Sequence, residues 1–181
     1  MGKVFFTSDI HFGHSNIIKY CRRPFASVEE MNEKIVRNWN EKVSREDEVF
    51  ILGDLSFMSA YATRLLMLRM NGKKYVIVGN HDKKLFKDRE LANCFEWIKD
   101  YAEIQYRGIP IVLFHYPIAM WNGRFHGAMH LYGHVHNGQD YYAFLKGRMT
   151  GDGSYNVGMD VNDFAPVDIE ELIEKNRQEN V

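Results

Sequence analysis

Polar residues that can bind metal ions occur in five short clusters along the chain. In order, the clusters are Asp9-Ile10-His11, Gly53-Asp54, Gly79-Asn80-His81-Asp82, His115 and Gly133-His134-Val135-His136. A ligand set of carboxylates, imidazoles and an amide oxygen favours Mn, Fe, Zn or Ni over Mg or Ca. The residue types therefore predict a site for divalent transition-metal ions.

The candidate ligands are numerous enough for two adjacent cations. Asp54 offers two oxygen atoms that can bridge such a pair, and metals in two-metal hydrolytic sites lie roughly 3.5–4 Å apart. Asp9, Asp54 and a bridging hydroxide would leave two divalent ions with a net charge of about +1, which attracts a phosphate group. The same charge stabilises the negative charge that develops during phosphate hydrolysis.

Each cluster follows an apolar run that predicts a buried strand. The runs cover residues 4–6, 49–52, 75–78, 111–114 and 130–132. Parallel strands of an open α/β sheet place their carboxyl ends along one edge, and ligands bind in the crevice outside that edge. We therefore expect the five clusters to converge, with Asp9 and His11 on one face if the first strand continues through them. His130, at the start of its run, is expected to be structural.

Helical patterns alternate with the strands in the first half of the chain. A capping box from Ser27 to Glu30 precedes apolar residues at helical spacing as far as Val43, and further helices are predicted over 59–70 and 83–92. The second half predicts a hairpin over 103–112, strands near 129–133 and 155–161, and a last helix from about residue 168. The expected fold is α/β, with two packed sheets and helices outside. Residues 137–154 are expected to form a glycine-rich surface loop.

Length and composition limit the possible classes of protein. The 181 residues fit one domain, 1–181, and the net charge of −1 lacks the basic excess of a dedicated nucleic-acid binder. No apolar stretch approaches the roughly 20 residues that span a bilayer. Cys21 and Cys94 form no CxxC pattern, so we expect reduced thiols in a cytoplasmic protein without a membrane segment. The sequence does not indicate an oligomeric state.

The ordered set of clusters resembles the calcineurin-like metallophosphoesterase superfamily. Asp-x-His, Gly-Asp, Gly-Asn-His-Asp, a lone His and Gly-His-x-His span residues 9–136. The tail from Asn156 to Val161 resembles that of small bacterial and phage members. The resemblance implies a four-layer α/β/β/α sandwich around a dinuclear metal centre, for which manganese is expected, with Fe, Zn or Ni as alternatives.

The resemblance also implies a role for each matching residue. The implied ligands are Asp9, His11, Asp54 and His136 for one metal, and Asp54, Asn80, His115 and His134 for the other. His81 would contact the phosphate and protonate the leaving group as a general acid. Asp82 would orient His81.

Several further residues near these motifs have two alternative interpretations, a role in substrate binding or a purely structural role. His14 and Arg124 are candidate substrate contacts, Arg124 as a bidentate phosphate donor. The loop of Arg124 and His126 could form the rim of a pocket. The alternatives are a loop or helix-capping role for His14 and a solvated loop for Arg124 and His126. The pair Arg22-Arg23 is either a phosphate clamp or a solvated surface pair, and the solvated pair is favoured.

The function expected from the sequence is a dinuclear metal-dependent phosphoesterase. A phosphodiesterase on small nucleotide-like substrates is favoured because a short chain without a cap domain suggests an open site, with a phosphomonoesterase (phosphatase) as the alternative. A nuclease is a further alternative, although the length leaves no room for added DNA-binding segments. A non-catalytic protein-binding scaffold is disfavoured, because His81 and all seven ligand positions are present.

Overall fold

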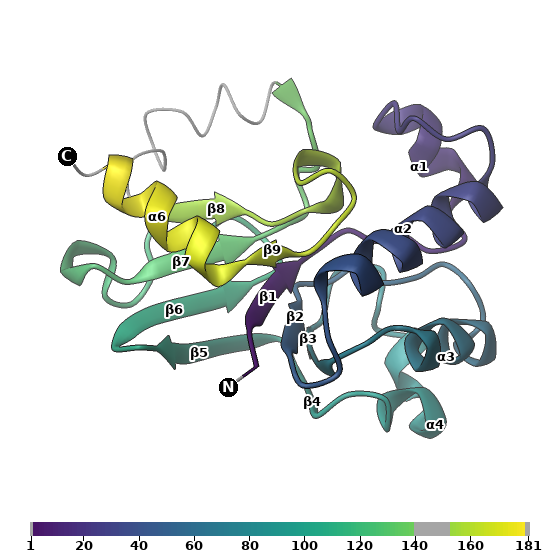
Figure 1. The fold of residues 1–181 in the computed structure, drawn as a ribbon, viewed down its shortest axis with the longest axis horizontal. Coiled ribbons are helices and arrows are strands. Elements are labelled where there is room, and N and C mark those ends of the chain that lie inside the picture. Colours follow the sequence, from purple (N-terminus) through teal and green to yellow (C-terminus); the bar gives the residue numbers. More distant parts are fainter. Residues whose placement is uncertain (1, 140–152, 180–181) are drawn as a thin grey trace.

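The computed structural model describes residues 2–139 and 153–179, which contain a five-stranded and a four-stranded β-sheet (Figure 1). The first sheet has the order β4-β3-β2-β1-β9 and the second the order β5-β6-β7-β8. The strands of the first sheet are β1 (Val4–Thr7), β2 (Glu48–Ile51), β3 (Lys73–Ile77), β4 (Trp97–Lys99) and β9 (Val167–Asp168). Those of the second are β5 (Tyr101–Tyr106), β6 (Ile109–Phe114), β7 (Met129–Tyr132) and β8 (Ser154–Asn156).

Strand direction follows the sequence patterns. β1 to β4 are parallel neighbours and β9 runs antiparallel to β1, whereas β6, β7 and β8 are parallel and β5 is antiparallel to β6. The predicted hairpin is therefore β5–β6, and its turn residues Arg107 and Gly108 both have positive φ, as in a type I′ turn. All five predicted runs form strands, but they belong to two sheets instead of one edge of a single sheet.

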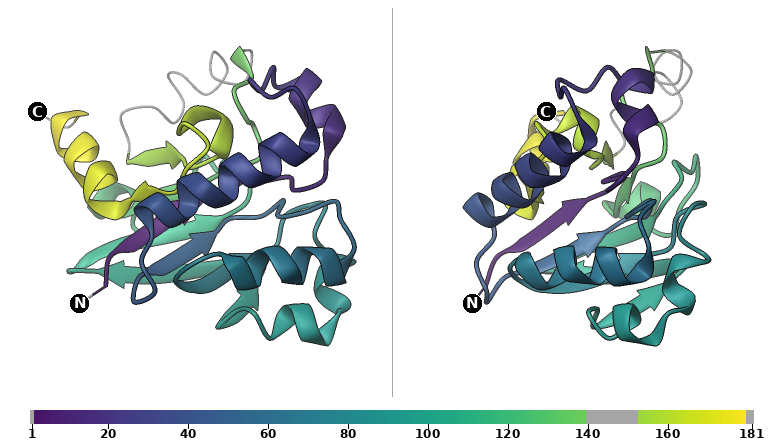
Figure 2. Two further views of the ribbon diagram at one scale, coloured as in Figure 1. Left: turned by 45° about the vertical axis from the view of Figure 1, so that its right-hand side comes forward. Right: turned by 90° about the vertical axis from the view of Figure 1, so that its right-hand side faces the viewer.

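Helices flank the two sheets (Figure 2). The helices are α1 (Ser15–Tyr20), α2 (Val28–Lys42), α3 (Ala60–Arg69), α4 (Arg89–Ala92) and α6 (Ile169–Glu179), with 3-10 turns η1 (Leu85–Lys87), η2 (Arg124–His126) and η3 (Met159–Val161). The N-cap predicted for α2 is present, since Ser27 Oγ accepts a hydrogen bond from Glu30 N at 3.1 Å. The side chain of Ser59 caps α3 in the same way.

The core has two main parts because alternate residues of each strand point to opposite faces. One face of the first sheet packs under α2 and α3, through residues that include Phe5, Val49, Ile51, Met31, Ile35 and Trp39. The opposite face meets the second sheet and α6, through residues that include Phe6, Phe50, Leu52, Leu113, Leu131 and Leu172. The predicted α/β sandwich, with two sheets flanked by helices, is confirmed.

Three local expectations differ from the structure. The single helix predicted over 83–92 is divided into η1 and α4, because Asp88 Oδ1 accepts from Leu91 N and starts a new helix. The strand predicted near 155–161 ends at Asn156, whose Oδ1 accepts from Gly158 N and turns the chain into η3. The short elements α1, β4 and β9 were not predicted, and most of the loop expected over 137–154 lies outside the described residues. Within the described ranges, no helix has the length and apolar character needed to cross a membrane.

Candidate metal centre

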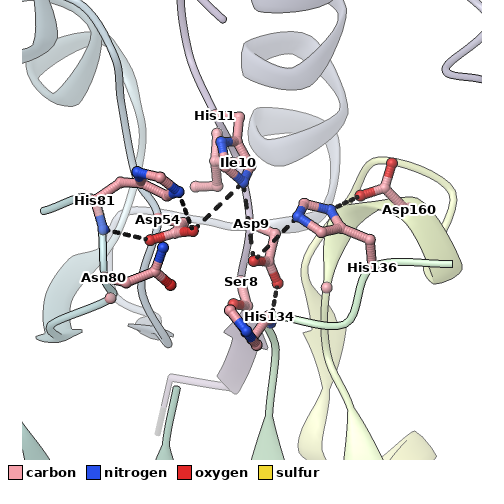
Figure 3. A network of polar contacts seen from close by, with 12 residues as sticks. Ser8, Asp9, Ile10, His11, Asp54, Asn80, His81, His134, His136 and Asp160 are labelled. Carbon is pink, nitrogen blue, oxygen red and sulfur yellow. Dashed lines mark hydrogen bonds and ion pairs between the residues drawn. The ribbon is translucent and has the colours of Figure 1, made fainter. Parts of the chain in front are cut away.

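The loops after β1, β2, β3, β6 and β7 bring the seven candidate ligands together at the carboxyl ends of both sheets. All of them except His115 are labelled in Figure 3. One group consists of Asp9, His11 and His136, whose ligand atoms all lie within 4.8 Å of one another. His11 Nε2 is 4.0 Å and His136 Nε2 is 3.8 Å from Asp9 Oδ1. A single cation can therefore reach all three side chains.

A second group lies beside the first and consists of Asp54, His115 and His134. Asn80 joins it, with its Oδ1 3.0 Å from His115 Nε2. Asp54 Oδ2 lies between the groups, 3.6 Å from His11 Nε2 and 3.7 Å from His115 Nε2. The two groups correspond to the ligand sets that the family resemblance implies, with Asp54 placed where it can serve both.

The backbone that carries these ligands is held in an uncommon conformation. Positive φ angles of 49–71° are found at five of the seven positions, namely Asp9, His11, Asp54, His134 and His136. Residues other than glycine rarely adopt this left-handed region, and such strain concentrates at functional sites. The Asp9-x-His11 and His134-x-His136 pairs therefore converge through left-handed loops. β1 ends at Thr7, so the condition for placing Asp9 and His11 on one face of a continued strand is not met.

Glycines before the ligands allow three loops to approach closely. A Cβ on Gly53 would lie 2.5 Å from His115 Nδ1, and one on Gly79 would collide with Asp54 Oδ1. A Cβ on Gly133 would collide with Ser8 Oγ and Asp9 Oδ2. The glycine of each Gly-Asp, Gly-Asn-His and Gly-His-x-His motif is therefore required by packing between the loops.

The hydrogen-bonding groups at the centre fit metal cations. Asp9 Oδ1 and His11 Nε2 are buried and have no hydrogen-bond partner among the described residues. His115 Nδ1 donates to Leu52 O at 2.7 Å, so its Nε2 presents a lone pair that faces another acceptor, Asn80 Oδ1. Cations would satisfy both the facing acceptors His115 Nε2 and Asn80 Oδ1 and the two buried atoms that lack a partner.

The charge state of the centre leads to the same conclusion. Burial raises the pKa of Asp9 and lowers the pKa values of His11 and His134, so the imidazoles stay neutral and keep free lone pairs. Burial also lowers the pKa of His136, but hydrogen bonds to Asp160 and Cys21 and the charge of Asp9 outweigh it and raise this pKa to about 10. The surroundings of His136 thus favour a positive charge there, which a metal ion at Nε2 would supply.

A buried ion pair between Arg23 and Asp160 holds the candidate ligand His136 in place, and the sequence did not reveal this pair. His136 Nδ1 donates to Asp160 Oδ2 at 2.7 Å, and Asp160 also accepts from Arg23 Nε and Nη2 at 2.8 and 2.9 Å. Arg23 further donates to the carbonyls of Asp9 and Ile10. Arg23 is only 4% exposed, so both readings proposed for it, a phosphate clamp or a solvated side chain, are wrong.

His81 lies at the mouth of the centre. Its side chain is 47% exposed, and its Nε2 is 4.0 Å from Asp54 Oδ2. Its backbone N–H donates to Asp54 Oδ1 at 3.1 Å. The imidazole can therefore reach both the ligands and a molecule that approaches from solvent.

Asp82 does not contact His81 in the described hydrogen bonds, contrary to expectation. Its buried carboxylate accepts from the backbone N–H groups of Asp54, Leu55 and Gly79 at 2.7–2.9 Å. Asp82 therefore fixes the loops that carry Asp54 and Asn80, and any effect on His81 passes through the backbone.

The remaining candidates lie in different surroundings. The His14 ring stacks on the Phe57 ring, with centroids 4.0 Å apart. His14 Nδ1 lies 3.4 Å from His11 Nδ1, so His14 borders the centre. The guanidinium of Arg124 contacts Ala119 O and the rings of Trp121 and Phe125, within its own loop.

Two histidines outside the ligand set also differ in burial. His126 is exposed. His130 is fully buried, donates through Nδ1 to Val112 O and accepts from Ile118 N, which confirms its structural role.

Comparisons with known proteins agree with this geometry. The family model of the calcineurin-like phosphoesterases matches residues 2–95. The uncharacterized protein MJ1445 of Methanocaldococcus jannaschii is 38% identical over 98% of this chain and 94% of its own length. The Gene 66 protein of Mycobacterium phage D29 is 28% identical over 93% of this chain and 94% of its own length.

A solved structure shares the fold along nearly the whole chain. The protein of unknown function AQ665 from Aquifex aeolicus has a TM-score of 0.72 and 25% identity, and the match covers 97% of this chain and 100% of that one. The family model covers more than half of the 181 residues and includes the loops of Asp9, Asp54 and Asn80. The chain thus belongs to the calcineurin-like phosphoesterase family.

Proposed function

We propose that this protein is a dinuclear metal-dependent phosphoesterase that hydrolyses phosphodiesters of small, nucleotide-like molecules. The observation that carries the proposal is the position of Asp54 Oδ2 between His11 Nε2 and His115 Nε2. One carboxylate at the centre of two ligand groups is the arrangement expected of a bridging ligand in a two-metal site.

The seven candidate ligands would hold two metal ions. Asp9, His11, Asp54 and His136 would hold one ion, and Asp54, Asn80, His115 and His134 the other. Two divalent ions held in this way would polarise a phosphate oxygen and lower the pKa of water to make a nucleophile near neutral pH. Manganese is proposed as the metal, with Fe, Zn or Ni as alternatives, because imidazole and carboxylate ligands are mixed.

His81 is the proposed proton donor. Its half-exposed imidazole stands beside the ligand groups, and its backbone is fixed by Asp54 Oδ1. A proton on Nε2 could pass to the oxygen of a departing alcohol, the step in which a general acid typically contributes 10²–10⁴-fold. Asp82 would assist by holding the backbone of this turn.

Free thiols support a reducing compartment. Cys21 and Cys94 are unpaired in the described structure. Disulfides are rare in the cytoplasm, where thiols stay reduced. We therefore place the activity in the cytoplasm.

The proposal is tested with purified protein that has been stripped of metal and reloaded separately with Mn, Fe, Zn, Ni or Mg. Hydrolysis of bis-p-nitrophenyl phosphate would report diesterase activity, and hydrolysis of p-nitrophenyl phosphate monoesterase activity. Asp54→Asn is the matched inactive variant, because it keeps the shape of the side chain but removes the negative charge that both metal ions would share. Metal-dependent hydrolysis that Asp54→Asn abolishes is the expected result. Failure of every metal with both esters would favour the scaffold alternative, and metal-dependent cutting of a fluorescent oligonucleotide would favour a nuclease.

A further inference from the structure

Two pockets open on opposite sides of the turn that carries Asn80 and His81. The Phe57 pocket has a volume of about 330 Å³ and is lined by Phe57, His81, Lys84 and Leu85 among others. The Tyr116 pocket has a volume of about 350 Å³ and is lined by Asn80, Lys83, Asp100, Phe114 and Tyr116 among others. Both volumes lie at the small end of the range for small-molecule sites.

The turn itself divides the two pockets. Asn80 and Lys83 line the Tyr116 pocket, whereas the residues that follow each of them, His81 and Lys84, line the Phe57 pocket. Asp82, between these pairs, points inward and binds the backbone beneath the metal centre. Each pocket therefore adjoins the candidate centre through a different residue, a ligand on one side and the proposed acid on the other.

Each pocket presents an exposed aromatic ring next to the candidate ligands. Phe57 is 43% exposed and its ring centroid is 4.8 Å from that of His81. Tyr116 is 36% exposed and its ring lies 4.6 Å from His134 and 4.9 Å from His115. Flat rings beside a phosphate site can stack on aromatic groups such as nucleobases.

The charges of the two pockets differ. Among the described residues, Lys84 and His81 are the titratable ones that line the Phe57 pocket, and none of its lining residues is a carboxylate. The Tyr116 pocket is lined by one cation, Lys83, and one anion, Asp100. An electron-rich leaving group is favoured in the first pocket, and a neutral polar ring in the second.

We infer that the two pockets hold the two arms of a phosphodiester, so that the substrate class is a diester with an aromatic group on each side of the phosphate, such as a nucleoside ester. This inference rests on the proposed phosphoesterase function. The arm in the Phe57 pocket lies next to His81 and leaves as the alcohol. The arm in the Tyr116 pocket stays on the phosphate, and the product is a phosphomonoester that carries it.

The test uses two esters that share a leaving group. p-Nitrophenyl phosphate has only the leaving arm, whereas the p-nitrophenyl ester of thymidine 5′-monophosphate has a nucleoside as the second arm. In Tyr116→Leu, the ratio of kcat/KM for the diester to kcat/KM for the monoester should fall by about tenfold, the loss expected for one stacked base. Lys83→Ala, at an exposed position in the lining of the Tyr116 pocket, should lower the same ratio by a smaller factor. Lys84→Glu should lower kcat/KM for both esters alike, because both place the nitrophenyl group in the Phe57 pocket.

Binding provides a second measurement that does not depend on turnover. Thymidine 5′-monophosphate, the product with the retained arm, should bind Tyr116→Leu about tenfold more weakly than the unchanged protein by calorimetry. The matched control is Lys87→Ala, an exposed lysine outside both pockets, which should change neither the ratio nor the binding.

The outcomes separate the two proposals. Turnover of both esters with an unchanged ratio in Tyr116→Leu and Lys83→Ala would overturn the pocket assignment alone. A reversed pattern, in which Lys84→Glu affects only the diester, would also overturn it. If neither ester is turned over with any of the metals, the proposed function and this inference are both overturned.

Discussion

Replacing Asp160 by Asn should weaken both the fold and metal binding. The Asp160 and Arg23 side chains are 1% and 0% exposed, and their closest approach is 2.8 Å. Loss of one partner from a buried pair leaves an uncompensated charge, which costs about 3–5 kcal/mol. Asn keeps one oxygen acceptor, so we expect the free energy of unfolding to fall by about 3 kcal/mol.

Metal affinity should fall for a separate reason. Asp160 accepts the Nδ1 proton of His136 and thereby directs Nε2 toward Asp9. Removal of such a partner of a metal-bound histidine typically weakens affinity by about 10–100-fold. Urea unfolding of the metal-free protein gives the stability, and competition with a fluorescent chelator gives the affinity for Mn²⁺.

A double variant separates the two effects. Arg23→Met with Asp160→Asn removes both charges and should recover much of the lost stability, but it should not recover the metal affinity. Asp163→Asn is the control, since Asp163 is exposed and Asn also tolerates its positive φ of 53°. Wild-type metal affinity in Asp160→Asn would refute the positioning role, and wild-type stability would refute the buried-pair argument.

The remaining predictions concern the acid, the loop contacts and pH. His81→Ala should keep its metal content by elemental analysis but lose roughly 10²–10⁴-fold in turnover, and unchanged turnover would exclude His81 as the acid. Gly79→Ala should displace Asp54 and reduce the metal content below two ions per chain, whereas Gly108→Ala, in open space, should leave the metal content unchanged. Burial lowers the pKa of His130 from 6.5 to about 4, so the unfolded chain binds its proton more readily. His130 alone should therefore cost the metal-free protein about 3 kcal/mol of stability as pH falls from 6.5 to 4, and urea unfolding of His130→Gln should show a loss that is shallower by about this amount.

Much of the site could be predicted because its signals are local in the sequence. Apolar runs predicted β1, β2, β3, β6 and β7, since a buried strand must be apolar wherever it lies in the sheet. The capping signal of Ser27 also needs only residues within one helical turn. The ligand types at the ends of these runs then indicated metal chemistry before any contact was known.

Other features depended on contacts that no local pattern records. Asp160 and Arg23 are 137 residues apart in sequence, and a buried ion pair has no periodicity to reveal it. The same is true of the Phe57 ring, which packs on His11, His14 and His81 from the loop after β2. A single helix was predicted over 83–92 because the helical pattern of the sequence is continuous there. In the structure, capping by Asp88 interrupts it and starts a new helix.

The sequence alone determined the chemistry available to this protein, because ligand type depends on residue identity and the order of the motifs. Only the tertiary structure decided how that chemistry is arranged. It placed three motifs on one sheet and two on the other, gave five of the candidate ligands a left-handed backbone conformation, and set Asp54 between two groups of candidate ligands. Distances between loops arise from packing of the two sheets and from glycine contacts across them, and those forces act between residues far apart in the chain.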